Sequence, residues 1–202
     1  MAEQNTLEEI VECIEAKKSF LIEAGAGSGK TRSLVDTLKY ILETNAESLS
    51  KNQQEIACIT YTNVAKDEII SRIDSNPLVL VCTIHEFLWH IIKNYQAELK
   101  SEVVVLNGST DEEENKRLQS VLAAKKIEYS QFGRNFEYGQ ISHDEVIKLA
   151  SVLFEKYPKI YRVVASKFPY ILVDEYQDTE EKVVTLLVDK LLPANEGKLV
   201  VG

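Results

Sequence analysis

SFLIEAGAGSGKTRSL, residues 19–34, joins a short apolar segment to three closely spaced glycines, which a lysine and a threonine follow. The segment 19–23 has the length and composition of a buried strand, and the residues from Thr31 onward have the apolar spacing of a helix. Glycines let backbone N–H groups turn inward around phosphate oxygens without clashes from Cβ atoms. A strand, a glycine-rich turn, Gly-Lys-Thr and a helix in this order predict a loop that binds a triphosphate.

Each part of this loop has an expected role toward the nucleotide. Lys30 supplies a point charge at the β and γ phosphates, the Thr31 hydroxyl can ligate Mg²⁺, and the helix N-terminus adds its positive dipole end. Arg32 lies either near the base of the nucleotide or exposed on the helix surface. The strict pattern begins with glycine, whereas this chain has Ala24 there. The residues expected to bind the nucleotide are Ala24, Gly25, Ala26, Gly27, Ser28, Gly29, Lys30, Thr31 and Arg32.

A second acidic motif, ILVDEYQDT at 171–179, ends a strongly apolar segment. The carboxyl ends of the strands in a doubly wound sheet form the edge where ligands bind. We therefore expect Asp174 to hold Mg²⁺ through water, and Glu175 to orient and deprotonate the attacking water. Lys30 and these two carboxylates should meet across one triphosphate, with Lys30 and Glu175 as the catalytic residues.

Apolar segments with the length of strands alternate with helical patterns over much of the chain. This alternation predicts an α/β fold with a parallel sheet. It fails between about 96 and 140, which contains a short EVVVL, a charged helix that opens with DEEE, and YSQFGRNFEYGQ. We expect a nucleotide-binding domain over 1–95 and 141–202, interrupted by a small, mostly helical insertion subdomain over 96–140.

Composition narrows the functional classes. No apolar run approaches the roughly 20 residues that cross a bilayer, and the three cysteines have no CxxC spacing, so we expect a cytoplasmic protein without a membrane partner. The net charge of −9 argues against nucleic-acid binding through bulk electrostatics. A narrow groove with a few aromatic and backbone contacts remains compatible with that charge.

Four motifs together resemble a known family. AGAGSGKT, ITYTNVAKDEI, CTIHEF and FPYILVDEYQDT, in this order, resemble the successive motifs of UvrD/Rep-type superfamily 1 DNA helicases. The resemblance covers about residues 19–95 and 141–202 and implies a RecA-like P-loop NTPase sheet flanked by helices. It also implies ATP and Mg²⁺ as cofactors and single-stranded DNA as a partner.

The same resemblance implies residues that contact DNA. Tyr61, Thr62 and Asn63 match the family segment that meets single-stranded DNA, with the tyrosine ring stacking on bases. His85 and Phe87 lie in the next such segment. Two alternatives stay open: Tyr61 as an amphipathic residue at a sheet edge, and His85 as a helix-start residue that bonds locally.

The resemblance also implies residues that link the ATP site to the rest of the motor, and it shows where this chain differs from the family. Gln177 and Asp178 are implied to couple the ATP site to the neighbouring motif, and Val64 stands where relatives usually carry a basic residue. The family continues past the point matching Gly202 into a second RecA-like domain with an arginine finger. Because such a finger is worth about 10³–10⁵ in turnover, we expect the 202 residues alone to bind nucleotide weakly and to hydrolyse it slowly or not at all.

The leading hypothesis is the first motor domain of an ATP-dependent DNA helicase or translocase, whose partner is the C-terminal motor domain of the same protein. An alternative keeps the ATPase but has it sense DNA and regulate a partner nuclease in repair or defence, with little unwinding. A small-molecule kinase fits poorly, since Arg117 and Arg134 are isolated and form no arginine-bearing lid.

Overall fold

The computed structural model describes residues 2–22, 29–175, 181–194 and 199–201. The chain divides into two compact units, one formed by residues 1–84 and 161–202 and the other by residues 85–160. The insertion expected at 96–140 lies within the second unit.

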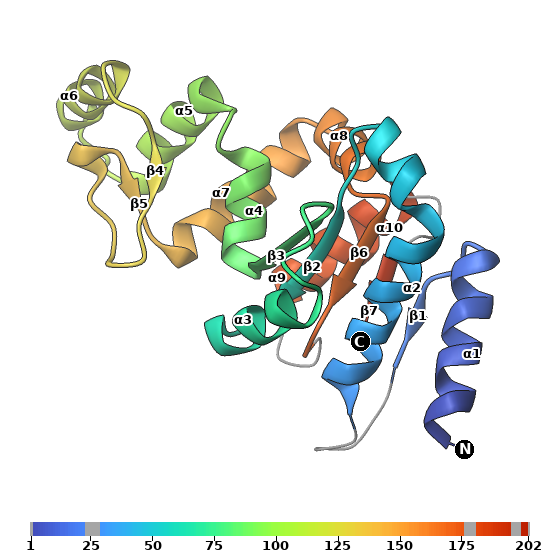
Figure 1. Cartoon of the computed structure of the whole chain (residues 1–202). Coiled ribbons are helices and arrows are strands. Elements are labelled where there is room, and N and C mark those ends of the chain that lie inside the picture. The colour runs from blue at the N-terminus through green and yellow to red at the C-terminus, as the bar shows by residue number, and fades with distance from the viewer. Residues whose placement is uncertain (1, 23–28, 176–180, 195–198, 202) are drawn as a thin grey trace. The chain divides into compact units, whose positions relative to one another are not determined.

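A parallel sheet of five strands organises the first unit (Figure 1). Its order is β1-β7-β6-β2-β3, and every neighbouring pair runs parallel. The inner strand β2 is buried along its whole length, which requires cover on both faces of the sheet. The strands are β1 (Phe20–Leu21), β2 (Ile56–Thr60), β3 (Val79–Thr83), β6 (Tyr170–Val173) and β7 (Leu199–Val201).

Helices pack against this sheet, and one hydrophobic cluster joins three of them to it. Leu34, Leu38 and Ile41 of one helix pack in the cluster with Ile10 and Ile14 of another and with alternate strand residues such as Ile56 and Cys58. In Figure 1, α2 lies in front of the sheet and α9 behind it. The helical elements are α1 (Ala2–Glu15), α2 (Lys30–Lys51), α3 (Asn63–Arg72), α8 (Lys159–Lys167, which begins just before the boundary of the unit), α9 (Glu181–Val184), a π-helical segment (Thr185–Leu191) and α10 (Leu192–Ala194).

Two helix boundaries differ from the sequence expectation. The polar stretch after Thr44 reads as a loop but continues α2 to Lys51, because Leu49 prolongs the apolar face and is 2% exposed. The spacing of Thr6 and Glu9 has the form of a capping box and predicts a helix start at Thr6, yet the first helix already begins at Ala2. Both differences lengthen a helix. The added residues, 2–5 and 45–51, include no glycine or proline, the residues that most often interrupt a helix.

The second unit is mostly helical and contains a small two-stranded sheet. Its EVVVL segment lies inside a helix, where Leu99 and Val103 are one turn apart and fully buried. Glu102 is buried in the same helix and pairs with Lys156 at 2.6 Å. The elements are α4 (Ile84–Ile92, beginning at the boundary), α5 (Gln96–Asn107), α6 (Glu112–Ala123), β4 (Glu128–Tyr129), a 3₁₀ helix (Phe136–Tyr138), β5 (Gln140–Ile141) and α7 (His143–Lys156).

The acidic run at 111–114 forms the N-cap and the first turn of α6. Asp111 caps the helix by accepting a hydrogen bond from the Glu113 backbone N–H at 2.9 Å, and the carboxylates that follow lie in the first turn, next to the positive dipole end. Within the described ranges, no helix combines the length and apolar character needed to span a bilayer.

Candidate nucleotide-binding and DNA-binding site

The sheet topology brings the predicted nucleotide-binding motifs to one edge of the first unit. Because all five strands are parallel, their carboxyl ends lie at the same edge, the lower one in Figure 1. The starts of α2 and α3 and the end of β6 lie at this edge. Ligands bind at this edge in open α/β sheets.

The start of α2 has a backbone that suits its position after a glycine-rich turn. Gly29 is the N-cap, with φ 84°, a left-handed conformation that favours glycine. Its carbonyl accepts the first helical hydrogen bond, from the Ser33 N–H at 2.9 Å. Lys30 is the first helical residue, and Thr31 is half-buried. The predicted residues Ala24, Gly25, Ala26, Gly27 and Ser28 lie outside the described residues, as does the side chain of Lys30.

Arg32 lies on the exposed side of α2. Its side chain is 65% exposed, and its Nε lies 3.9 Å from a carboxylate oxygen of Asp36, one helical turn on. An exposed pair at this distance contributes little to stability. This position agrees with the surface alternative for Arg32, and a nucleotide contact by this residue stays a prediction.

Asp174 is a buried carboxylate at the same edge. It is 3% exposed, and its backbone N–H donates to the Ile59 carbonyl at 2.8 Å, so it prolongs the pairing of β6 with β2. Since side chains alternate along a strand, Asp174 shares a face with Leu172, which packs in the cluster that contains the α2 leucines. Asp174 therefore lies on the face of the sheet that α2 covers.

Asp174 lies close enough to the buried thiol of Cys58 to affect its pKa. Burial raises the pKa of Cys58, and the nearby groups Cys82 and Asp174 raise it further. Cys58 is thus a neutral, buried thiol, as its place in an apolar segment suggests.

Glu175 has an uncommon backbone conformation. It is half-exposed and has φ 56°, in the left-handed region that few residues other than glycine adopt. Such a conformation costs on the order of 1–3 kcal/mol and occurs most often at functional sites. The predicted coupling residues Gln177 and Asp178 lie outside the described residues.

The described oxygen donors at this edge include one carboxylate and one hydroxyl. Among the described residues, no cluster of three or more His, Cys, Asp or Glu side chains could hold a metal ion. Mg²⁺ in nucleotide sites takes one or two carboxylates together with phosphate oxygens and waters. The buried Asp174 and the half-buried Thr31 match this smaller demand.

Thr60 is a residue of this edge that the sequence analysis missed. It ends β2 and is 1% exposed, and its hydroxyl has no hydrogen-bond partner among the described residues. Its only sequence signal is a polar residue closing an otherwise apolar strand.

The residues predicted to contact DNA follow directly after β2. Tyr61 is half-buried, whereas Thr62 and Asn63 are exposed. The Thr62 hydroxyl accepts a hydrogen bond from the Ala65 N–H at 3.1 Å and so caps α3. Val64, in the first turn of α3, is 78% exposed, so the side chain at this position projects into solvent.

His85 belongs to an aromatic cluster in the second unit. Its ring centroid lies 4.4 Å from that of His143, whose Nδ1 lies 2.8 Å from the Tyr129 hydroxyl. Burial lowers the pKa of His85, and the neighbouring His143 lowers it further, while Asp144 acts in the opposite direction. The His85 ring thus contacts a residue that is distant in the sequence, and a contact of His85 with DNA stays a prediction. Phe87 is fully buried, so its ring is not available to stack on a base.

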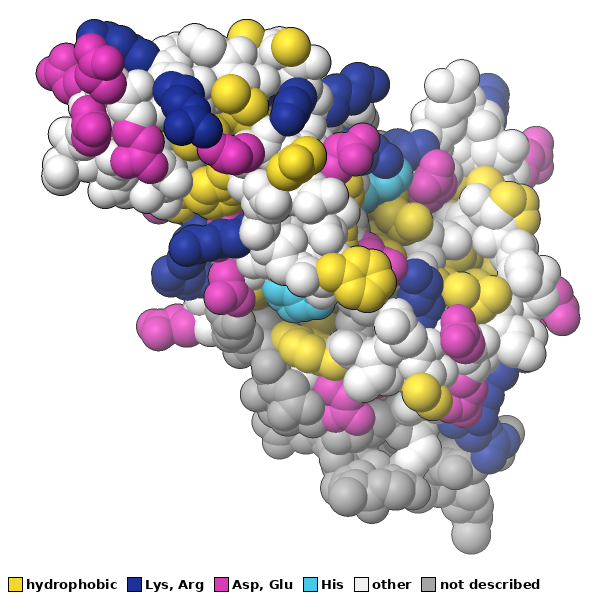
Figure 2. Space-filling view, turned by 90° about the vertical axis from the view of Figure 1, so that its left-hand side faces the viewer, with side chains coloured by type: hydrophobic (Ala, Val, Ile, Leu, Met, Phe, Trp, Pro, Cys, Tyr) yellow, Lys and Arg dark blue, Asp and Glu magenta, His cyan; other side chains and the backbone are white. Residues whose placement is uncertain are grey.

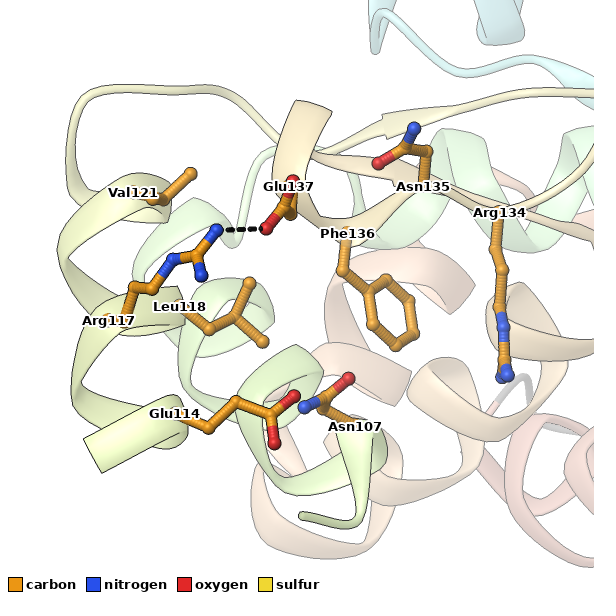
Figure 3. A pocket seen from close by; sticks show the side chains of 9 residues that line it. All are labelled: Asn107, Glu114, Arg117, Leu118, Val121, Arg134, Asn135, Phe136 and Glu137. Carbon is orange, nitrogen blue, oxygen red and sulfur yellow. Dashed lines mark hydrogen bonds and ion pairs between the residues drawn. The ribbon is translucent and has the colours of Figure 1, made fainter. Parts of the chain in front are cut away.

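A pocket of about 270 Å³ lies in the second unit, and none of the predicted site residues lines it (Figure 3). Figure 3 shows Phe136 and Leu118 beside it, with Arg117 paired to Glu137 at 2.7 Å. The Arg134 guanidinium lies 5.5 Å from the centre of the Phe136 ring. The charged residues that line the pocket are two arginines and two glutamates, so their charges do not favour a ligand of one sign.

Charge on the molecular surface is mixed. On the face shown in Figure 2, Lys and Arg side chains alternate with Asp and Glu, and the described residues there form no broad basic field. With a net charge of −9, this distribution is compatible with nucleic-acid contact through a few residues rather than through bulk attraction.

The chain is similar over most of its length to parts of larger bacterial proteins. It is 27% identical to the Gabija protein GajB of Bacillus cereus (strain HuB5-5), over 92% of this chain and 40% of that protein. It is 27% identical to the ATP-dependent DNA helicase PcrA of Staphylococcus epidermidis (strain RP62A) over 88% of this chain and 30% of the helicase. The same helicase of Staphylococcus aureus (strain Mu50) is 26% identical over 90% of this chain and 30% of its own length. The chain therefore spans less than half the length of these relatives.

A family model matches nearly the whole chain. The model describes the UvrD/REP helicase N-terminal domain, and its two overlapping matches cover residues 4–136 and 107–202. These matches include the starts of α2 and α3 and the end of β6, the elements that form the edge described above. The chain belongs to the UvrD/REP helicase N-terminal domain family.

Proposed function

We propose that this chain is the first, RecA-like motor domain of an ATP-dependent DNA helicase or translocase, formed by residues 1–95 and 141–202 with an insertion at 96–140. The observation that carries the proposal is the position of Asp174. This buried carboxylate lies at the sheet edge where α2 begins, and on the face that α2 covers. A carboxylate at this position is the kind of oxygen ligand that Mg²⁺ takes beside phosphate oxygens, and ligands bind at this edge in open α/β sheets.

In this proposal each residue of the edge has one task. Lys30 and the loop 24–29 bind the phosphates, Thr31 and Asp174 hold Mg²⁺, and Glu175 orients the attacking water. The left-handed backbone of Glu175 turns the chain at the end of the strand. In this proposal, the turn sets the direction in which the Glu175 side chain leaves the backbone.

The DNA strand is proposed to pass the segment that follows β2. Tyr61 supplies a stacking surface that is independent of base identity, and the exposed Thr62 and Asn63 supply polar contacts. Because these residues connect β2 to α3, and β2 pairs with β6, nucleotide and DNA would act on adjacent parts of one sheet.

The test compares ATP turnover of the longer parent protein with and without single-stranded DNA, followed by strand displacement on a tailed duplex. Lys30→Ala should abolish both activities. Tyr61→Ala should reduce DNA stimulation while nucleotide affinity stays at the wild-type level. If DNA-stimulated turnover survives Tyr61→Ala unchanged, the stacking role is wrong.

A second candidate function is an ATPase that senses DNA and regulates a partner nuclease, with little unwinding. The net charge of −9 favours it, since a processive motor holds its track through several phosphate contacts. In the same assays, DNA-stimulated turnover without strand displacement would select this candidate.

A further inference from the structure

Thr60 occupies a position next to Asp174 at the carboxyl edge of the sheet. The register of β2 and β6 pairs Ile56 with Tyr170 and continues to Ile59 with Val173, so Thr60 and Asp174 form the next pair. Neighbouring strands lie about 4.8 Å apart. The hydrogen bond from the Asp174 N–H to the Ile59 carbonyl shows that the two chains are still paired at this point.

The two side chains also point to the same face. Along β2, Ile56 and Cys58 belong to the cluster packed under α2, so the alternation places Thr60 on that face as well. On β6 the same alternation relates Asp174 to Leu172. A buried hydroxyl and a buried carboxylate are therefore neighbours beneath α2.

The hydroxyl of Thr60 is not used within the described part of the protein. It is buried, and no described group lies within hydrogen-bonding geometry, including the adjacent carboxylate. A buried hydroxyl without a partner destabilises the folded chain, and valine would fill the same space without that cost. An external hydrogen-bonding group next to Thr60 would satisfy its hydroxyl.

We propose that Thr60 is a positioning residue whose hydroxyl binds a water of the Mg²⁺ ion held by Asp174. Mg²⁺ in nucleotide sites keeps several bound waters. Each of these waters can donate hydrogen bonds to a nearby oxygen, and the Thr60 hydroxyl is such an oxygen. The inference rests on the proposed function, because it requires a magnesium–nucleotide complex at this edge. It adds a link between that complex and the predicted DNA segment, since Thr60 immediately precedes Tyr61.

The experiment measures the affinity of the 202-residue chain for a fluorescent, non-hydrolysable ATP analogue, once with Mg²⁺ and once with EDTA. The ratio of the two affinities reports the contribution of the metal. In Thr60→Val we expect this ratio to fall by about three- to tenfold, the effect of one hydrogen bond. The affinity in EDTA should equal that of the wild type, and Thr60→Ser should restore the ratio.

Thr37→Val is the matched control, because Thr37 is also fully buried but donates its hydroxyl to the Ser33 carbonyl at 2.7 Å. It should lower the thermal midpoint of the nucleotide-free chain and leave the ratio unchanged. Thr60→Val should keep the wild-type midpoint or raise it.

Three results would count against the inference. An unchanged ratio in Thr60→Val would overturn it while the proposed function stands, provided that Lys30→Ala abolishes binding. A clear fall of the nucleotide-free midpoint in Thr60→Val would mean that the hydroxyl has a partner within the protein. If the wild-type chain and Lys30→Ala bind the analogue equally, the proposed function fails, and the inference fails with it.

Discussion

Single residues at the carboxyl edge of the sheet have features that are uncommon in a protein core. Asp174 is a buried carboxylate, Glu175 has a left-handed backbone, and Thr60 is a buried hydroxyl without a described partner. The backbone conformation of Glu175 and the buried hydroxyl of Thr60 each destabilise the fold when taken alone. Their concentration at the end of two paired strands, rather than through the core, is what a binding edge predicts.

His85 makes stability depend on pH in the second unit. Burial lowers its pKa, and His143 lowers it further, so below about pH 6.5 the unfolded chain takes up a proton that the folded chain resists. Stability should therefore fall as the pH drops from 7.5 to 5.5, and His85→Asn should reduce this fall. Urea unfolding at the two pH values measures it. An equal loss in wild type and variant would show that His85 has no part in it.

At the scale of elements, helix starts set the geometry on which the sites depend. At the start of α7, burial alone would raise the pKa of Glu145, but hydrogen bonds from Ser142 and the nearby Arg134 outweigh burial and lower it. The Glu145 carboxylate accepts from the Ser142 N–H at 3.0 Å and from its hydroxyl. This is the capping box that the sequence pattern at Ser142 and Glu145 predicts, and it is confirmed.

Ser142→Ala should lower the free energy of unfolding by about 1 kcal/mol at pH 7, the usual effect of losing a helix cap. Since the pKa of Glu145 is lowered in the fold, its contribution is present above its ordinary value and is lost as the pH falls below about 4. The difference between wild type and variant should shrink accordingly in chemical unfolding at pH 3.5. Ser151→Ala, in the same helix, removes only a hydroxyl that bonds to the Ile147 carbonyl at 2.9 Å, and should have a smaller effect.

Val64 offers a gain-of-function test at the start of α3. Because its side chain is 78% exposed, Val64→Lys should leave stability within about 0.5 kcal/mol of wild type. If DNA passes this segment, the new charge should raise the affinity of the parent protein for single-stranded DNA and steepen the salt dependence by about 0.7 in logarithmic slope. Val105→Lys, 70% exposed in the second unit, adds the same charge elsewhere. Equal effects of the two variants would contradict the predicted path.

At the scale of the whole molecule, the proposed function gives this chain one side of a nucleotide site. The chain spans 40% of the length of the GajB relative and 30% of the PcrA relatives. The family resemblance implies that an arginine finger from a second motor domain completes catalysis, which is worth about 10³–10⁵ in turnover in related systems.

The isolated 202 residues should consequently bind nucleotide but turn it over slowly, without stimulation by DNA. Phosphate release from the purified chain, with and without single-stranded DNA, measures this directly. The parent protein assayed in parallel is the control. Robust DNA-stimulated release from the 202 residues alone would show that the second domain is not needed.

The sequence by itself determined the order of strands and helices and the family, because these depend on local patterns. Apolar segments, capping residues and the Gly-Lys-Thr motif act within a few residues of one another, so their spacing can be read along the chain. Prediction from the sequence failed where local signals were weak. It missed the polar continuation of α2 to Lys51, and it placed a helix start at Thr6, which lies within a helix.

Only the tertiary structure decided which residues share a surface. The pairing of β2 with β6 places Thr60 beside Asp174 although 114 residues separate them in the chain, and the packing of α4 makes Phe87 a core residue rather than an exposed ring. Burial and strand register arise from contacts between distant segments, and no local pattern specifies them. The polar residues at the ends of β2 and β6 can be located in the sequence, whereas their burial and their arrangement at one edge required the fold.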